Sequence, residues 1–215
     1  MKVGIIGSGQ VGQVLASAFI NEGHEAMIGT RDLSKEAVVQ WKENNPTGLT
    51  GSFAEAAAFG ELVVLATQGD AAQDALAQAG IENLAGKTVI DATNPIKKGP
   101  PVNGVLQFFT GPNESLMEQL QQQAPDAHFV KAFNSVGSGF MYRPDFGGTQ
   151  PTMFICGNDA TAKQTVTDIL GAFGWDTADM GKAESARAIE PLCMLWCLPG
   201  FLNNQWSHAF KLLKK

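Results

Sequence analysis

Short apolar runs alternate with segments of helical periodicity along most of the chain. The apolar runs predict strands, at Lys2–Ile6, Glu25–Gly29, Leu62–Ala66, Lys87–Asp91 and His128–Ala132. The periodic segments predict helices, at Gln10–Asn21, Ser34–Glu43, Phe53–Ala58, Ala71–Ala79 and Glu114–Gln123. Because strands and helices alternate in this way, we expect a parallel sheet with helices on both faces.

The pattern changes after Ala132. Phe133–Gln150 contains four glycines and few periodic apolar positions, which predicts a long loop. A further strand–helix–strand unit is expected at Thr152–Cys156, Ala160–Phe173 and Trp175–Ala178. The last segment, from about Glu184 to Leu213, is expected to be helical but broken, with an interruption at Pro199–Gly200. We therefore expect a doubly wound α/β domain in residues 1–134 and a small C-terminal α/β portion in residues 135–215.

A glycine motif lies between the first predicted strand and the first predicted helix. Gly7-Ser8-Gly9-Gln10-Val11-Gly12 has the spacing G-x-G-x-x-G, which in this context is typical of dinucleotide-binding proteins. The first glycine permits a tight turn, the second lets the backbone approach a pyrophosphate, and the third lets helix and strand pack closely. Free N–H groups at the helix start would stabilise the anion. The alternative is a glycine-rich turn without a ligand.

The end of the second predicted strand indicates which dinucleotide is bound. Thr30 stands about where an NAD-binding protein places a carboxylate on the ribose 2′-hydroxyl. Arg31 follows and Lys35 is near, and both cations suit the additional phosphate of NADP(H). Asp32 would be the NAD-type acid if the register shifted by two, but we expect it to cap the following helix. The sequence thus favours NADP(H).

Composition excludes several classes of protein. The 215 residues carry 15 Lys and Arg against 21 Asp and Glu, a net charge of −6 that argues against a nucleic-acid partner. No apolar run reaches the roughly 18 residues needed to span a bilayer, so no membrane partner is expected. The chain starts directly with a strand pattern rather than a leader, and its three cysteines are scattered. We therefore expect a cytoplasmic protein.

Several further motifs resemble the NADPH-dependent reductases of the deazaflavin coenzyme F-420, and the oxidoreductase domain of the related mammalian metalloreductases. These motifs are Gly29-Thr30-Arg31, Leu62–Thr67, Asp91-Ala92-Thr93-Asn94-Pro95, Val130-Lys131-Ala132-Phe133-Asn134, and Ala186–Pro191 followed by Leu195-Trp196. The resemblance implies a Rossmann-type doubly wound parallel sheet with a small C-terminal α/β portion. It also implies hydride transfer between NADP(H) and a small-molecule redox acceptor: a deazaflavin, a flavin or a quinone.

The same resemblance assigns roles to individual residues. Ser8, Gln10 and Val11 would meet the pyrophosphate, and Thr30, Arg31 and Lys35 the 2′-phosphate. Ala66 and Thr67 would lie by the ribose. The residues expected near the nicotinamide are Asn94, Pro95, Ala132 and Asn134. These last two groups follow predicted strand ends, where ligands of open parallel sheets bind.

No catalytic acid–base constellation is evident, which leaves two alternatives open. One is a non-catalytic regulator that senses NADP(H). The other is a reductase of a small carbonyl or imine, with Lys131 as the proton donor. Cys193 and Cys197 have a spacing that could bind metal, but without a third ligand nearby we expect them in the core and predict no metal site.

The C-terminal region is rich in large apolar residues. They are Leu192, Leu195, Trp196, Leu198, Phe201 and Trp206. Such residues would bury well against a second copy, so we expect a homodimer, with ordinary core packing as the alternative. The segment Lys97–Asn113 is long and could form part of an acceptor rim.

Overall fold

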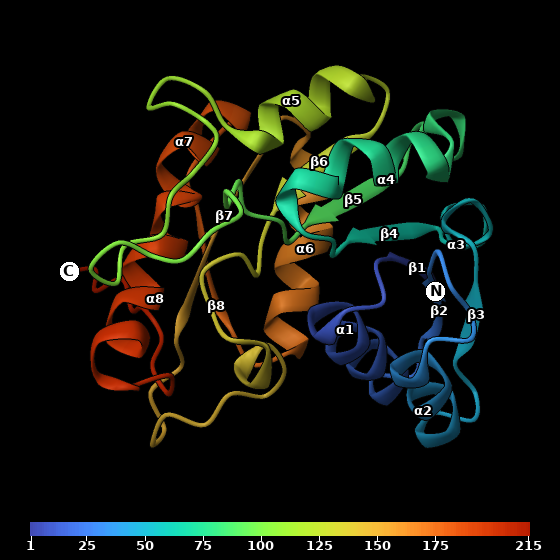
Figure 1. Cartoon of the computed structure of the whole chain (residues 1–215), viewed down its shortest axis with the longest axis horizontal. Helices are drawn as coiled ribbons and strands as arrows, with labels where there is room; N and C mark the ends of the chain where they lie inside the picture. Colours follow the sequence, from blue (N-terminus) through green and yellow to red (C-terminus); the bar gives the residue numbers. More distant parts are fainter.

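Eight strands form one sheet in the computed structural model, which describes all 215 residues (Figure 1). The strands are β1 (Lys2–Ile6), β2 (Glu25–Gly29), β3 (Leu49–Gly51), β4 (Leu62–Leu65), β5 (Thr88–Asp91), β6 (His128–Lys131), β7 (Thr152–Gly157) and β8 (Asp176–Asp179). Their order is β3-β2-β1-β4-β5-β6-β7-β8. Strands β1 to β6 are parallel, and their order is that of the doubly wound Rossmann fold. The predicted fold class is confirmed.

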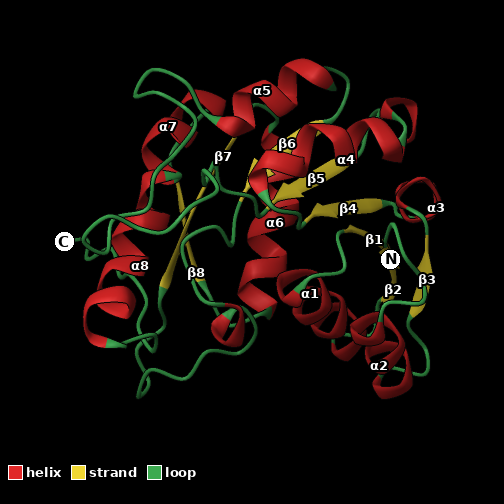
Figure 2. Ribbon diagram, in the orientation of Figure 1, coloured by secondary structure: helices red, strands yellow, loops and turns green.

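Helices cover both faces of the sheet (Figure 2). They are α1 (Gln10–Asn21), α2 (Glu36–Asn44), α3 (Phe53–Phe59), α4 (Ala72–Ala79), α5 (Leu116–Gln123), α6 (Ala160–Ala172), α7 (Ala186–Ile189) and α8 (Pro191–Asn203). Short 3₁₀ turns are η1 (Gly69–Ala71), η2 (Ile81–Leu84), η3 (Ser138–Phe140) and η4 (Ala183–Ser185). No helix combines the length and the apolar character that crossing a membrane requires.

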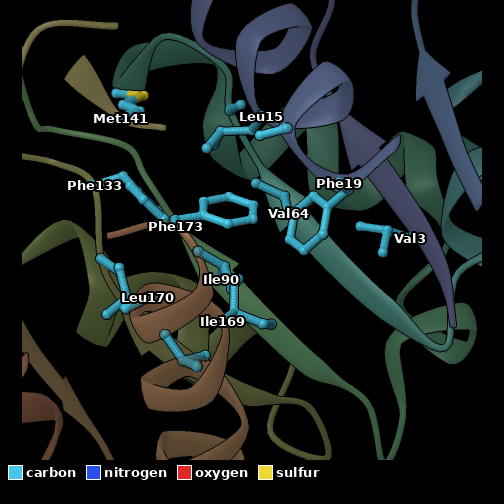
Figure 3. Packing of buried hydrophobic residues seen from close by; sticks show 14 of the residues in the cluster. Val3, Leu15, Phe19, Val64, Ile90, Phe133, Met141, Ile169, Leu170 and Phe173 are labelled. Atoms are coloured by element: carbon cyan, nitrogen blue, oxygen red, sulfur yellow. The ribbon is translucent and has the colours of Figure 1, made fainter. Parts of the chain in front are cut away.

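The core divides into two clusters, one on each face. On one face, residues from α1 and α6 pack against the sheet; on the other, residues from α3, α4, α5 and α7 do so. Phe173 lies at the centre of an aromatic group in the first cluster (Figure 3). Its ring centroid is 5.1 Å from that of Phe19, 5.2 Å from that of Tyr142 and 6.1 Å from that of Phe133. These contacts join α1 and α6 to the loop that follows β6.

The C-terminal strands extend the same sheet with one change of direction. β7 runs antiparallel to β6, with Lys131 opposite Cys156, and β8 is parallel to β7. The predicted strand–helix–strand unit is therefore present as β7-α6-β8. The segment 133–150 is a loop apart from η3, as its glycine content indicated.

Two local predictions differ in outcome. The capping box at α3 is confirmed, because the Ser52 side chain accepts from Glu55 N while the Glu55 carboxylate accepts from Ser52 N. The helix predicted from Ser34 begins only at Glu36. The reason is that Asp32 Oδ1 accepts hydrogen bonds from both Ser34 N, at 2.9 Å, and Ser34 Oγ, at 2.6 Å, which holds the chain in a turn before the helix.

The prediction for the C-terminal segment was wrong in two respects. Helix α8 continues through Pro199 instead of breaking there. Pro199 removes a hydrogen bond to the Leu195 carbonyl, but Leu195 is on the surface, where water can replace the lost donor. After Asn203 the chain forms neither helix nor strand, so the helical prediction fails for the rest of the segment, up to Leu213. Asn204 has a φ of 53°, which turns the chain back over α8, where the His208 ring stacks on Trp196.

Candidate functional site

A cleft of about 550 Å³ lies at the carboxyl ends of β1, β2 and β4. This is the point where the strand order reverses, because β1 has β2 on one side and β4 on the other. Of the residues predicted to bind a cofactor, ten line the cleft: Gly7, Ser8, Gly9, Gln10, Val11, Thr30, Arg31, Lys35, Ala66 and Thr67. The structure thus brings together three segments that are distant in sequence.

The three glycines of the motif differ in what surrounds them. A Cβ at Gly7 would collide with the Ala66 carbonyl, and Gly7 also has a φ of 129°. A Cβ at Gly12 would collide with the Gly7 carbonyl, so Gly12 packs inward and does not line the cleft. A Cβ at Gly9 would meet no atom within 4 Å. Packing within the protein therefore requires glycine at positions 7 and 12, but not at position 9.

Hydrogen bonds hold this loop against the end of β2. Ser8 Oγ lies 3.0 Å from Thr30 Oγ1, and Thr30 Oγ1 also accepts from Asp32 N at 3.2 Å. On the other side, Gln13 Nε2 donates to Ser8 O at 3.0 Å. The first-turn N–H groups of α1 begin at Gln10, have no intrahelical partners, and carry the positive end of the helix dipole.

Two cations stand on the β2 side of the cleft without an ionic partner. Arg31 and Lys35 both line the cleft, and neither forms an ion pair. The Asp32 carboxylate also lines it but is engaged by Ser34. Hydrogen bonds from the Ser34 side chain and backbone lower the pKa of Asp32, which keeps this carboxyl ionised. Because Arg31 and Lys35 are unpaired and the Asp32 carboxylate is bound by Ser34, this wall of the cleft can bind an anion.

The opposite wall was not found by the sequence analysis. It consists of Phe53 and of residues at or after the end of β4: Gln68, Ala71, Asp74, Ala75 and Gln78. Residues 71, 74, 75 and 78 have the i, i+3, i+4, i+7 spacing of one helical face. That periodicity was visible in the sequence, but it did not reveal that the face would turn toward the cleft.

The four residues predicted near a nicotinamide do not line this cleft. Asn94, Pro95, Ala132 and Asn134 instead lie at the neighbouring ends of β5 and β6. Asn94 Nδ2 donates to Asn134 O at 2.8 Å, and Asn134 Nδ2 donates to Asn94 Oδ1 at 3.2 Å. The Asn94 carbonyl lies so close to Gly69 that no side chain would fit there. Because Gly69 follows the cleft residue Gln68, the hydrogen-bonded amide pair of Asn94 and Asn134 adjoins the cleft.

Phe133 directs the chain between β6 and Asn134. It has a φ of 63°, an uncommon conformation for a bulky residue. Its side chain is fully buried in the aromatic group of Figure 3, which stabilises the conformation. The sharp turn at this position brings Asn134 to face Asn94, and nothing in the sequence indicated it.

A buried charge cluster lies directly behind the amide pair. Lys131 Nζ contacts Asp91 Oδ2 at 2.7 Å, Glu190 Oε1 at 2.9 Å and the Thr93 carbonyl at 2.9 Å, and all three charged side chains are almost completely buried. Burial alone would lower the pKa of Lys131, but Asp91 and Glu190 outweigh it and raise the pKa above 10.5. Lys131 is therefore a charged, paired and inaccessible ammonium, whose partner Glu190 the sequence analysis did not identify.

The cysteine and histidine side chains form no metal-binding cluster. No group of three or more His, Cys, Asp or Glu side chains is arranged to hold a metal ion. All three cysteines are free, and burial raises the pKa of Cys156 to about 12. This thiol is therefore unreactive at neutral pH.

Comparison with known proteins connects this geometry to a family. The profile described as "NADP oxidoreductase coenzyme F420-dependent" matches residues 2–95. A solved structure from Arthrobacter sp. FB24, provisionally named an F420-dependent NADP reductase, is 35% identical, with a TM-score of 0.92 over the full length of both chains. The chain belongs to the coenzyme F420-dependent NADP oxidoreductase family.

Other proteins similar to this NADP oxidoreductase are named for different reactions. The rat metalloreductase STEAP3 is 30% identical in an alignment of 211 positions, which covers 94% of this chain and 39% of the metalloreductase. The chain thus spans well under half of that relative. A reductive aminase from Aspergillus terreus in complex with NADPH and ethyl-5-oxohexanoate is 18% identical, with a TM-score of 0.67 over 94% of this chain and 63% of that one. This last likeness shows the fold alone.

Two unpartnered polar atoms bear on whether a nicotinamide nucleotide fits. Thr67 Oγ1 and Asn134 Oδ1 are buried without a hydrogen-bond partner. Thr67 lies in the cleft and Asn134 at the adjoining strand end. Together with the open space at Gly9 and the free cations, these atoms fit a ligand that combines a diphosphate, a further phosphate and hydrogen-bonding groups.

Proposed function

We propose that this oxidoreductase binds NADP(H) in the cleft and transfers hydride between it and a planar redox acceptor of the deazaflavin, flavin or quinone type. The observation that carries the proposal is Gly9. Its Cβ position is empty, so glycine there is explained by the close approach of a ligand to the backbone rather than by packing. The unpaired cations beside it explain why that ligand would be NADP(H).

Each part of the cofactor has a matching part of the protein. The first-turn amides of α1, with Ser8, Gln10 and Val11, would bind the pyrophosphate. Arg31 and Lys35, with the Thr30 hydroxyl, would bind the 2′-phosphate, because a guanidinium can pair with a phosphate bidentately. The ribose would lie beside Ala66 and Thr67. The nicotinamide, which supplies or accepts the hydride when bound, would lie toward Asn94, Pro95, Ala132 and Asn134.

The chemistry around the amide pair supports hydride transfer without a protein proton donor. The ionisable side chains behind it, Asp91, Lys131 and Glu190, are buried and engaged with one another. Reduction of a carbonyl or imine with Lys131 as the donor is disfavoured, because the donor must reach the substrate. Transfer between two stacked rings needs mainly orientation and exclusion of water. This favours the acceptor class that the family name describes.

The test has two stages. First, dissociation constants for NADPH and NADH are compared; tighter binding of NADH would contradict the 2′-phosphate assignment. Second, NADPH absorbance is followed after addition of the deazaflavin coenzyme, a free flavin or a quinone. Accelerated oxidation with one of them is expected. Tight NADPH binding without acceleration by any of the three would contradict the proposed reaction and favour a sensing role.

The proposed enzyme is a homodimer through its C-terminal region. Exposed apolar side chains lie on α8, on the following tail and on the segment 97–113, and Gly104 of that segment lies against Leu202. The exposed residues are Val102, Val105, Phe109, Leu195, Phe201, Leu202 and Trp206. Light scattering at micromolar concentration should give twice the chain mass, and Leu202→Glu should reduce it to one chain. A monomeric wild type would disprove the dimer.

A further inference from the structure

Three donors from two other elements bind the carboxylate of Glu190, which lies at the junction of α7 and α8. Its Oε1 accepts from Lys131 Nζ at 2.9 Å and from Met117 N at 3.0 Å, and its Oε2 accepts from Leu116 N at 3.0 Å. One carboxylate therefore connects the end of β6, the start of α5 and the junction of α7 and α8. The two amides belong to the first turn of α5, where a negative charge is favoured.

This fixed carboxylate also fixes its neighbour. The carbonyl of Ile189, the preceding residue, accepts from Asn134 Nδ2 at 3.0 Å. Lys131 acts on the other member of the amide pair in the same way, because it binds the carbonyl of Thr93, next to Asn94. The charge cluster thus holds the backbone on both sides of the Asn94–Asn134 pair.

The consequence is a defined orientation for the Asn134 amide. Its Nδ2 has two acceptors, Ile189 O and Asn94 Oδ1, so the nitrogen must point toward them. Its Oδ1 is then directed away from both, and it is the atom that lacks a partner. A buried, unpaired acceptor is costly to the free protein, and a ligand N–H group such as a carboxamide would satisfy it.

We propose that Glu190 is a positioning residue for the nicotinamide end of the cofactor, acting through Lys131 and the Ile189 carbonyl to orient the Asn134 amide. The inference rests on the proposed function, because it takes NADP(H) as the ligand. Glu190 and Lys131 touch no ligand in this scheme. They set the direction of the acceptor that does.

The buried cluster of Asp91, Lys131 and Glu190 is not needed merely to hold α7 against α5. The exposed ion pair between Arg187 and Glu118, with Nε to Oε2 at 2.9 Å, already joins α7 to α5 at the surface. A buried set of two carboxylates and one ammonium could be replaced by apolar side chains at little cost in stability. The need to orient the side-chain amide of Asn134 explains why this buried position carries charged groups instead of apolar ones.

The experiment compares NADPH with 2′-phospho-ADP-ribose, which lacks the nicotinamide, on three proteins. In wild type, NADPH should bind more tightly than the fragment. In Glu190→Gln, one of three donors loses its acceptor, and the affinity ratio of NADPH to fragment should fall about three- to tenfold while fragment affinity is unchanged. In the control Glu118→Gln, which removes a carboxylate joining the same two helices, the ratio should not change.

Three results would overturn the inference. An unchanged ratio in folded Glu190→Gln would do so, whether both affinities are retained or both fall by the same factor. Equal binding of NADPH and fragment by wild type would overturn it while leaving the adenosine half of the proposed function intact. Binding of neither ligand by wild type would reject the proposed function and the inference together. If Glu190→Gln does not fold, Asp91→Asn/Lys131→Met/Glu190→Met leaves no unpaired buried charge and should show the same fall; an unchanged ratio there would equally contradict the role.

Discussion

Substitution of Gly9 by alanine tests the proposed cofactor site with little disturbance of the fold. Gly9 has a φ of −76° and a ψ of −179°, which alanine adopts readily, and the added Cβ would meet no protein atom within 4 Å. Alanine is a poorer N-cap than glycine, but it also reduces the freedom of the unfolded chain. These effects oppose each other, so the free energy of unfolding should change by less than about 1 kcal/mol.

The effect on binding should be much larger. A methyl group at Gly9 would occupy the space between the backbone and a bound pyrophosphate, so hydrogen bonds from the loop amides to the anion would lengthen or break. A hydrogen bond to a charged group contributes about 1.5–3 kcal/mol. Loss of one such bond corresponds to a roughly 10- to 100-fold weaker affinity for NADPH.

The assay measures unfolding and NADPH binding on the same preparations, by urea denaturation and by calorimetry. Gly9→Ala should unfold as wild type does and bind NADPH at least tenfold more weakly. The comparison variant is Gly12→Ala, whose Cβ would collide with the Gly7 carbonyl and should destabilise the fold itself. Wild-type NADPH affinity in Gly9→Ala would refute the reasoning, because it would mean that no ligand approaches this backbone.

Three further outcomes are expected. Arg31→Ala should weaken NADPH binding about tenfold or more and leave NADH binding nearly unchanged, measured by calorimetry; equal losses would contradict a 2′-phosphate contact. Phe173→Ala should lower the free energy of unfolding by about 3–5 kcal/mol in urea, because the side chain is fully buried among aromatic rings; a loss below 1 kcal/mol would disprove that packing. A hydrogen bond from Arg187 lowers the pKa of Glu118 below 4.5, so its stabilising contribution is present above pH 4.5 and lost as the pH falls through the folded-state pKa. Wild type should therefore exceed Glu118→Gln in stability at neutral pH and lose that advantage in acid; a pH-independent difference would contradict the ion pair.

Local signals in the sequence were sufficient for the first half of the site. The glycine motif, the preceding apolar strand and the Thr30-Arg31 pair are close to one another in sequence, and the regular β-α order brings their segments to one edge of the sheet. The capping box at Ser52 was readable for the same reason, since both partners lie within four residues. The strand Leu49–Gly51 was missed because three residues are too few to show a period.

Partners far apart in sequence could not be predicted. Glu190 meets Lys131 and the start of α5 only after the C-terminal segment has folded back on the sheet. Asn134 faces Asn94 because Phe133 adopts a left-handed conformation that its buried aromatic neighbours stabilise. The end of α8 likewise depends on where the tail packs, which no local propensity specifies.

The sequence by itself determined the fold class and the glycine-rich turn at the edge of the sheet, because periodicity and the glycine spacing act through backbone geometry within a few residues. The tertiary structure decided which groups are available to a ligand. It left Arg31 and Lys35 without ionic partners and placed a face of α4 opposite them, while it buried Lys131 between two carboxylates. The physical reason is that availability depends on burial and on charged partners, and packing between distant segments sets both.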